Sequence, residues 1–596
     1  MAYELNKLLC VLSLVCWSNQ QPTPLDSCEG RPMVDTKQGS ICGVQCPDGP
    51  VEVCGKKVEA VKTRKYRAFS GIPFAKPPVN ELRFKRPVPG EPWNGVRDGS
   101  WMPPLCPQFD MMGFFSGNMT LLGQEDCLFL NVYVPEVEAP VTGFPVMVFI
   151  HGGGFSMGGI DGYFADKLMR RDVILVNIQY RLGILGFLST GDEVAPGNLA
   201  IKDQELSLRW VQDNIDRFGG DPRKVTIFGE SAGGMSVHYQ ILNPEAKGLF
   251  SGAILQSGTA LLDFFGDMDQ RDMAYQVASK LGCSIQRDGY KSEELLQCLQ
   301  EIPASGLVKI AMAFVEWGNA PIPFSPRIGE ASLPDLPARL LRDGKYNKVD
   351  IMMGINQNEG GLFAKYLSVT PNAFKDLETN FSRIGHHMFA MNKKYNDVAK
   401  QLFQNYLGGI REYQEDDMDL FAEMIGDYMF DMPHDYSIEL HSRDSLYGKN
   451  TYAYELKHKG DADLGDLVAP HLGREYVNHG ADLIYLFKMM PDLFNETSNP
   501  EKQKLESIML DLWTNFATHG NPTPDRSLGF TWMPVSPKST DHLVLKPEPY
   551  MEADTRCQRR KFFSSLNFRM NQDLFPDRIG AGPTWKPWRI QDLKKC

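Results

Sequence analysis

The chain has 596 residues, a formal net charge of −12, 42% apolar residues and 23% charged residues. Such a composition permits a sizeable hydrophobic core and excludes disorder on a large scale. The acidic balance argues against nucleic acid and against an anionic membrane surface, because both attract basic proteins. We therefore expect neither a nucleic-acid nor a membrane partner.

The N-terminus has the pattern of a secretory signal peptide. A polar stretch ending at Lys7 is followed by an apolar run at 8–17 and then by the polar residues 18–22. The run is too short to span a bilayer, but it has the length of the hydrophobic region of a signal. We predict a signal peptide over 1–19 and a secreted, extracellular protein.

Secretion implies an oxidising compartment in which proteins are also glycosylated. Three Asn-x-Ser/Thr sequons occur, at Asn118, Asn380 and Asn495, whereas Asn521 precedes a proline and is excluded. We predict N-glycosylation at the three sequons.

Strand-like and helix-like segments alternate through the middle of the chain. The segment 199–217 has apolar residues at helical spacing. Five short apolar runs are typical of buried strands: 144–150, 173–178, 225–228, 252–255 and 351–355. The alternation predicts an α/β fold with a mostly parallel twisted sheet and helices on both faces. Because no linker interrupts it, we expect one domain over 20–566 and a C-terminal tail, extended or docked, over 567–596.

The pentapeptide GESAG at 229–233 fits the Gly-x-Ser-x-Gly pattern. Alone it is weak evidence, because a chain with 54 glycines can match it by chance. Its context strengthens it, since the predicted strand 225–228 runs into the motif and a helical pattern follows Ser231. A strand, a tight turn and a helix with serine at the turn form a nucleophile elbow. Glycines flank the serine because a Cβ there would clash with neighbouring backbone.

A second motif, HGGGF at 151–155, follows the predicted strand 144–150. It is not a P-loop, because no Gly-Lys-Ser/Thr follows it. It is not a dinucleotide fingerprint either, because Met157 stands where the third glycine belongs. The motif matches a loop that donates backbone N–H groups to an oxyanion. We assign Gly153, Gly154 and Ala232 as the oxyanion donors.

A serine nucleophile needs a base, and in this architecture an acid and then a histidine follow the serine along the chain. Glu359 is the best-placed acid, because it lies in a turn directly after the predicted strand 351–355. For the base, the pattern alone leaves His479 and His471 as candidates.

Further motifs resemble those of the type-B carboxylesterases and cholinesterases, which have the α/β-hydrolase fold. They cover 34–566 and include FSGIPFAKPP at 69–78, QEDCLFLN at 124–131, NIQYR at 177–181 and FGGDP at 218–222. The resemblance implies that Glu359 is the triad acid and His479 the base, because HGAD at 479–482 is similar to the family's His-Gly-x-Glu segment. It also implies the disulfides Cys106–Cys127 and Cys283–Cys298.

The chain departs from this family in its cysteines. Those at 28, 42, 46 and 54 lie in an N-terminal insertion, where we expect one or two additional bridges. Cys557 does not match the third disulfide of cholinesterases, and Cys596 is a candidate intermolecular thiol.

Other departures concern the substrate. The segment 106–127 contains three phenylalanines and no tryptophan, whereas the choline site of cholinesterases is built on tryptophan, over which cation–π attraction is strongest. Juvenile-hormone esterases usually carry Gly-Gln-Ser-Ala-Gly and a glycine three residues before the histidine. This chain has Glu230 and Tyr476 at those positions. It most resembles the secreted carboxylesterases of insect type.

The sequence therefore predicts a secreted serine esterase that cleaves small carboxylic esters by acyl transfer, as a monomer or homodimer. We expect no metal and no organic cofactor. Activity is expected to fall below about pH 6.5, as the histidine protonates. One alternative is a specialised hormone- or odorant-degrading esterase. The other is a non-catalytic binding or adhesion homologue, whose mark is a missing triad residue.

Overall fold

The computed structural model describes these residues: Leu25, Cys28, 30–46, 51–53, 56–58, 64–110, Gly113, 119–262, 269–285, 291–317, 322–389, 391–461, 463–469, 474–489 and 499–579. The predicted signal peptide at 1–19 lies outside the described residues. So do the sequons at Asn118 and Asn495 and the rival base His471.

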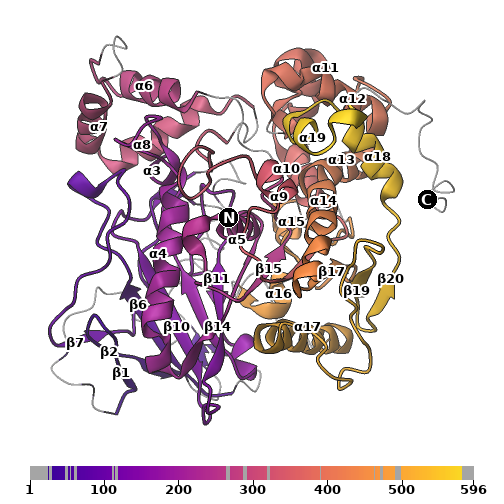
Figure 1. Cartoon of the computed structure of the whole chain (residues 1–596). Coiled ribbons are helices and arrows are strands. Elements are labelled where there is room, and N and C mark those ends of the chain that lie inside the picture. The colour runs from indigo at the N-terminus through magenta and orange to yellow at the C-terminus, as the bar shows by residue number, and fades with distance from the viewer. Residues whose placement is uncertain are drawn as a thin grey trace.

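A large sheet runs through the centre of the described chain (Figure 1). Its strands, in spatial order, are β20 (Tyr550–Glu552), β19 (His542–Leu545), β17 (Thr451–Leu456), β16 (Asp350–Asn356), β15 (Gly252–Gln256), β14 (Gly220–Glu230), β11 (Phe144–Ile150), β13 (Ile174–Ile178), β10 (Phe129–Pro135), β6 (Tyr66–Pro73) and β3 (Val44–Cys46). Neighbours from β19 to β13 run parallel, and the pairings toward both edges are antiparallel. The predicted mostly parallel sheet is confirmed.

Helices lie on both faces of this sheet, and others pack on these helices (Figure 1). The α-helices of the described residues are α3 (Gly183–Phe187), α4 (Leu199–Asn214), α5 (Ala232–Leu242), α6 (Gln270–Lys280), α7 (Ser292–Glu301), α8 (Ala304–Ala311), α9 (Pro337–Arg342), α10 (Gly361–Val369), α11 (Ala373–Ile384), α12 (Asn396–Leu407), α13 (Met418–Gly426), α14 (Met432–His441), α15 (Leu464–Val468), α16 (Leu483–Leu486), α17 (Pro500–His519), α18 (Cys557–Ser565) and α19 (Arg569–Leu574). Helices α11 to α14 gather with α18 and α19 at the upper right of Figure 1.

Smaller strands form separate sheets. They are β1 (Met33–Asp35) with β2 (Ser40–Cys42) and β7 (Val96–Asp98), β4 (Val51–Val53) with β5 (Lys56–Val58), β8 (Gln108–Phe109) with β9 (Leu121–Leu122), and β12 (Tyr163–Phe164) with β18 (Lys488–Met489).

The central strands bury both faces, which explains their continuous apolar sequence. All seven residues of β11 are buried. Val146 and Val148 belong to one hydrophobic core, whereas Met147 and Phe149 belong to the other. Successive side chains of a strand point to opposite faces, so β11 joins the two cores. Helices α4 and α5 contribute to the first core and α17 to the second.

The five predicted strands and the predicted helix are confirmed, with shifted ends. β14 extends the predicted run 225–228 in both directions and reaches Glu230, directly before the nucleophile motif. The helix predicted over 199–217 is α4, followed by a 3-10 turn over Ile215–Phe218 that ends at Gly219, with φ of 88°. A positive φ favours glycine at this helix end.

Three disulfides lie among the described residues: Cys28–Cys42, Cys106–Cys127 and Cys283–Cys298. The last two are the pairs that the family resemblance implies, and the first lies in the N-terminal insertion. Cys557 is also disulfide-bonded.

The described part of the expected tail is docked. Residues 569–574 form α19, which packs against α9. Arg339 of α9 pairs with Asp573 of α19 at 2.7 Å. The sequon at Asn380 is exposed, at a kink within α11.

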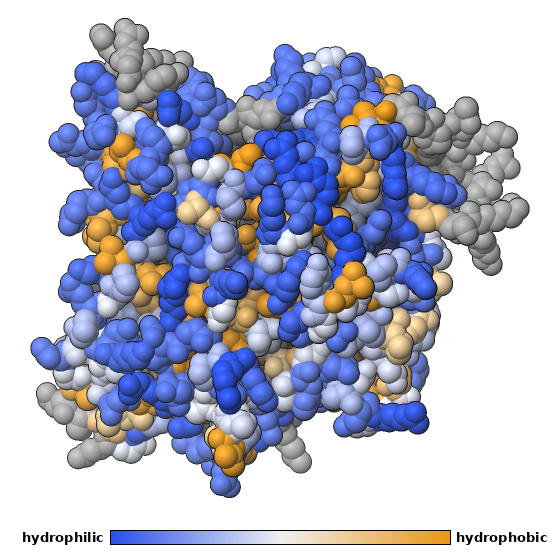
Figure 2. Space-filling view, in the orientation of Figure 1, coloured by the Kyte–Doolittle hydropathy of each residue, from blue (hydrophilic) through white to orange (hydrophobic). Residues whose placement is uncertain are grey.

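The face shown in Figure 2 is mainly hydrophilic, with scattered apolar residues. Within the described residues, no helix has both the length and the apolar character needed to cross a bilayer.

Candidate active site

Ser231 stands between β14 and α5, in a backbone conformation that is rare for a residue with a Cβ. Its φ is 59° and its ψ is −124°. Its side chain is partly exposed, although the residues on both sides are buried. Such strain persists only where the surrounding structure holds it. The backbone N–H of Ser231 donates to the carbonyl of Gln256 at 2.8 Å, and its carbonyl accepts from Met235 at 2.9 Å.

The glycines of the motif give the turn its space. A Cβ at Gly229 would lie 2.5 Å from the carbonyl oxygen of Ile150, and one at Gly233 would lie 2.0 Å from it. Both distances are well below van der Waals contact, so neither position accepts a side chain. The strand, the turn and the helix thus have the geometry of a nucleophile elbow, with Ser231 at its tip.

The glycine loop after β11 lies against the elbow. A Cβ at Gly152 would be 3.2 Å from the Cβ of Ser231. Gly153 and Gly154 have φ of 104° and 61°, conformations that glycine adopts readily. Tyr180 fixes the start of the loop, because its hydroxyl donates to the carbonyl of His151 at 2.7 Å and the two rings stack.

Glu359 and His479 meet although 120 positions separate them. Nδ1 of His479 lies 2.7 Å from Oε2 of Glu359, and both side chains are buried. The second carboxylate oxygen, Oε1, accepts the backbone N–H of Asn356 at 2.7 Å. Glu359 is therefore held at both oxygens. A carboxylate in this position orients an imidazole and favours its charged form.

The loop that carries His479 is tied to the turn that carries Glu359. The backbone N–H of Asn358 donates to the carbonyl of Val477 at 3.0 Å. In return, the side-chain oxygen of Asn358 accepts the backbone N–H of Val477 at 3.0 Å. Nδ2 of Asn356 donates to the carbonyl of Asn478 at 2.9 Å. The same short turn thus positions both members of the pair.

Glu230 is a site residue that sequence reasoning missed. Its Oε1 lies 3.2 Å from Nε2 of His479, without hydrogen-bond geometry, and only 5% of the residue is exposed. The signal was present, because Glu230 is the variable position of the motif. However, a pattern that fixes only Gly and Ser assigns no role to the residue between them.

The charges in this cluster shift each other's proton affinity. Burial raises the pKa of Glu230 to about 8, against the opposing effect of His479. Burial lowers the pKa of His479, but Glu230 and Glu359 outweigh it and raise the pKa to about 9. The two shifts are linked, since Glu230 raises the pKa of His479 only while it is ionised. They therefore form one coupled pair, in which the nearby carboxylates hold the pKa of His479 above its ordinary value. We therefore expect the acid limit of activity to lie above pH 6.5.

Asp482 adds a further buried carboxyl behind the pair. Its Oδ2 accepts Nε2 of Gln256 at 2.7 Å and the hydroxyl of Tyr454 at 3.1 Å. Burial raises its pKa. This is the residue at the position of the family's glutamate in His-Gly-x-Glu, and here it supports the strand end beside Ser231 through Gln256.

Two phenylalanines cover the ring of His479. Phe430 has its ring centre 4.4 Å from that of His479, and Phe363 has its ring centre 5.7 Å away. Sequence reasoning did not find either residue, because neither lies in a motif. They form an apolar wall that limits the water around the imidazole.

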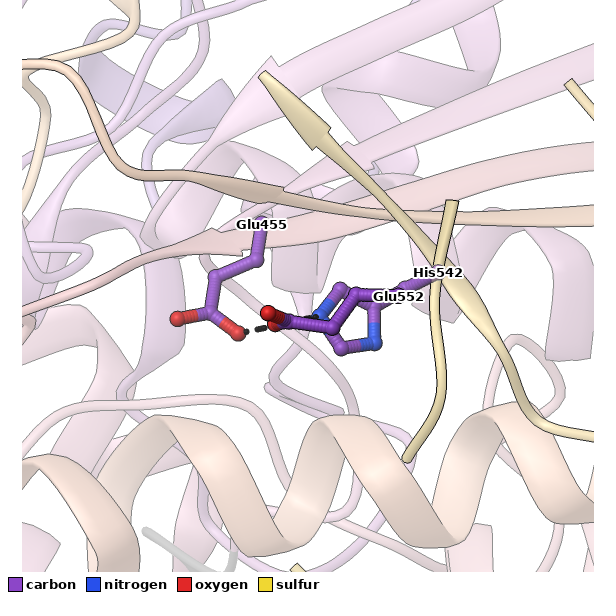
Figure 3. A group of neighbouring side chains, drawn as sticks. All are labelled: Glu455, His542 and Glu552. Carbon is purple, nitrogen blue, oxygen red and sulfur yellow. Dashed lines mark ion pairs between the residues drawn. The ribbon is translucent and has the colours of Figure 1, made fainter. Parts of the chain in front are cut away.

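In the described part of the chain, one group of side chains has ligand atoms close enough to hold a metal ion: Glu455, His542 and Glu552 (Figure 3). Nε2 of His542 lies 3.3 Å from Glu455 and 3.4 Å from Glu552. However, Arg556 pairs with Glu455 at 2.8 Å, and Lys457 pairs with Glu552. Two cations already balance the two carboxylates, so little charge remains to attract a metal. We interpret the group as an ion-pair network.

Comparison with known proteins identifies the family of this chain. The sequence profile of the Carboxylesterase family matches residues 40–563. Juvenile hormone esterase of Tribolium castaneum is 36% identical over 524 residues, which cover 84% of this chain and 85% of that protein. Esterase FE4 of Myzus persicae is 33% identical, with 82% and 86% covered. Liver carboxylesterase 1 of Oryctolagus cuniculus is 34% identical, with the same coverage.

The chain therefore belongs to the carboxylesterase family, with the α/β-hydrolase fold of that family. It is a carboxylic ester hydrolase of the type-B class, and its substrates are small esters.

Proposed function

We propose that Ser231, His479 and Glu359 form the catalytic triad of this esterase. His479 takes the proton of the Ser231 hydroxyl as the serine oxygen attacks the ester carbonyl. Glu359 holds the imidazole and stabilises its charged form. The imidazolium then protonates the leaving alcohol, and water hydrolyses the acyl-enzyme by the reverse proton transfers. The 2.7 Å contact between His479 and Glu359, beside a strained serine elbow, carries the proposal.

The backbone N–H groups of Gly153, Gly154 and Ala232 are the proposed oxyanion donors. Support comes from the loop's closeness to the serine, since a Cβ at Gly152 would nearly touch the Cβ of Ser231. Support also comes from Ala232, which begins α5 and so has an N–H without a partner inside its helix. Each donor of this kind contributes about two to three orders of magnitude in rate.

The proposed substrate range is that of a general carboxylesterase acting outside the cell. The three described disulfides and the predicted signal peptide support secretion. A hormone-degrading role is the second candidate, favoured by the relative named juvenile hormone esterase. Against it stands Glu230, whose carboxyl beside His479 can exchange a proton, unlike the glutamine amide of the hormone-esterase motif.

Covalent labelling with an organophosphate, followed by peptide mapping, tests the triad. The label should fall on Ser231, and Ser231→Ala should abolish both labelling and ester hydrolysis. Ser257→Ala is a matched control, because Ser257 is a buried neighbour with a similarly positive φ of 52°. A label elsewhere, or full activity in Ser231→Ala, would overturn the assignment. Hydrolysis of a panel of acyl-chain lengths, with a juvenile-hormone ester included, separates the two substrate classes.

A further inference from the structure

A π-helical turn, Asp427–Asp431, joins α13 to α14 directly in front of the proposed base. It carries Phe430, whose ring lies 4.4 Å from that of His479. A π turn holds one more residue than an α-helical turn, and such turns are frequent at functional sites. The extra residue decides which side chain of this segment faces His479.

The first residue of the turn is tied to the C-terminal helix α18. Asp427 is fully buried, and its Oδ1 accepts Nη1 of Arg559 at 3.0 Å. Its Oδ2 accepts the hydroxyl of Tyr406. Arg559 also pairs with Glu423, one turn earlier, at 2.5 Å. A buried carboxylate is tolerated only when it is paired, so Arg559 is what permits Asp427 to remain inside.

The far side of the turn is tied to the same helix. Asp435, in α14, receives two hydrogen bonds from Arg556, at 3.0 and 2.8 Å, and a third from Arg560 at 2.8 Å. Arg556 also binds Glu455, which links this contact to the ion-pair network of Figure 3. Helix α18 and Arg556, the residue directly before it, therefore hold the segment on both sides of the π turn, and α18 lies beside α14 in Figure 1.

We propose that Arg559 is a positioning residue of this esterase: by pairing with Asp427 it holds the π turn, which keeps Phe430 packed on His479. The proposal rests on the proposed role of His479 as base. None of the contacts of Arg559 among the described residues reaches the triad, so its effect passes through the turn.

The geometry explains why loss of the Arg559–Asp427 ion pair should affect the active site. If the turn relaxed to an ordinary α-helical one, the side chains in its last part, Phe430 among them, would rotate about the helix axis by as much as about 100°, the angle of one residue. Phe430 would then leave the ring of His479. An imidazole that loses a packed neighbour samples other orientations, and misplacing a catalytic group by about 1 Å can cost about a hundredfold in rate.

A double-mutant cycle between Arg559 and Phe430 tests the proposal. The effects of the two substitutions should depend on each other only if the turn links Arg559 to the contact between Phe430 and His479. The variants are Arg559→Met, Phe430→Leu and the double variant. The readouts are kcat and KM for a short-chain ester, per active site titrated with an organophosphate. Each single variant should lower kcat about tenfold or more, with a smaller change in KM. The double variant should be no slower than the slower single one.

Arg339→Met is the matched control, because Arg339 pairs with Asp573, and this ion pair includes no residue of the π turn or of α18. Arg339→Met should keep the parent kcat. If Arg559→Met merely destabilised the helix, its melting temperature would fall but its kcat would not change. If Arg559→Met does not fold, Asp427→Asn replaces it, since the amide keeps the shape and removes the charge.

Two results would overturn the inference: a kcat within about twofold of the parent in the folded variant, or losses in the two single variants that multiply in the double one. Both leave the triad intact, because the parent would still label at Ser231. A parent that does not label there overturns the proposed triad, and this inference with it.

Discussion

Oε1 of Glu230 lies 3.2 Å from Nε2 of His479, the ring nitrogen that Glu359 leaves open. The imidazole therefore sits between two carboxyl groups, one at each nitrogen. One of them, Glu359, is the acid expected in a Ser–His–acid triad. The other is Glu230, the residue immediately before the proposed nucleophile, so the elbow itself contributes to the proton affinity of the proposed base.

The first prediction concerns the pH dependence that this contact creates. His479 acts as a base only when it is neutral, and nearby carboxylates raise its pKa. The acid limb of kcat/KM should therefore lie above pH 6.5 in the parent enzyme. Glu230→Gln removes one carboxylate and should move the limb to lower pH by about one unit or more, since each unit corresponds to about 1.4 kcal/mol of interaction. The profile is measured from pH 5 to pH 10 at constant ionic strength.

Glu439→Gln is the control, because Glu439 is exposed on α14 and its loss should leave the profile unchanged. An acid limb that stays in place in Glu230→Gln would show that the contact with Glu230 does not govern the base.

The second prediction separates the two carboxyl groups by role. Glu359→Gln keeps the shape but can no longer stabilise an imidazolium, so kcat should fall by about three to four orders of magnitude. The fall should be far larger than in Glu230→Gln, because Glu359 also fixes the orientation of the ring through Nδ1. Steady-state kinetics with one ester measure both. Equal losses in the two variants would contradict this division.

The sequence predicts the parts of the site that local structure creates. The elbow and the glycine loop are each a short continuous stretch of sequence. Their glycines are required by close contacts with the backbone of their own segments and of the adjacent strand. Glu359 is found because parallel strands end at one edge, so a turn after β16 reaches the elbow after β14. In these cases a few neighbouring residues specify the geometry.

The sequence does not predict contacts that only tertiary packing creates. His479 follows from chain order and family resemblance, not from its own surroundings, because its partner lies 120 positions away. Phe430, which packs on His479, lies in a π turn, and the Asp427–Arg559 pair joins residues 132 positions apart. No periodicity in the chain encodes these distances.

The third prediction contrasts two adjacent glycines of the proposed oxyanion loop, Gly153 and Gly154. At Gly153 a Cβ would lie 2.1 Å from the carbonyl oxygen of Met157, with φ of 104°, whereas at Gly154 the nearest atom is 3.8 Å away, with φ of 61°. Gly153→Ala must therefore displace the loop, and kcat should fall by about two orders of magnitude or more. Gly154→Ala keeps its N–H in place and should lose about tenfold or less.

Gly248→Ala controls for backbone strain alone, because its φ is 81° and no atom lies within 4 Å of the added Cβ. Kinetics and melting temperature are measured together on all three variants. Equal activity in Gly153→Ala and Gly154→Ala would argue against this account of the loop.

The fourth prediction concerns stability and the buried pair of Arg181 and Asp203. Nε and Nη2 of Arg181 donate to the two oxygens of Asp203 at 2.8 and 2.7 Å, and Asp203 is fully buried. Arg181→Met leaves that carboxylate unpaired, so the free energy of unfolding should fall by about 3–5 kcal/mol. Arg181→Met with Asp203→Leu removes both charges and should recover most of the loss. Urea unfolding of the three proteins measures these differences.

The pH dependence of this loss identifies its cause. Burial already raises the pKa of Asp203 against the opposing effect of Arg181, and removing Arg181 raises it further. A carboxyl whose pKa is higher in the folded than in the unfolded state takes up a proton on folding, so the variant should regain stability as the pH falls through that pKa. The deficit of Arg181→Met should therefore shrink between pH 8 and pH 5. A deficit that stays constant over this range would point to lost packing of the arginine instead of an unpaired charge.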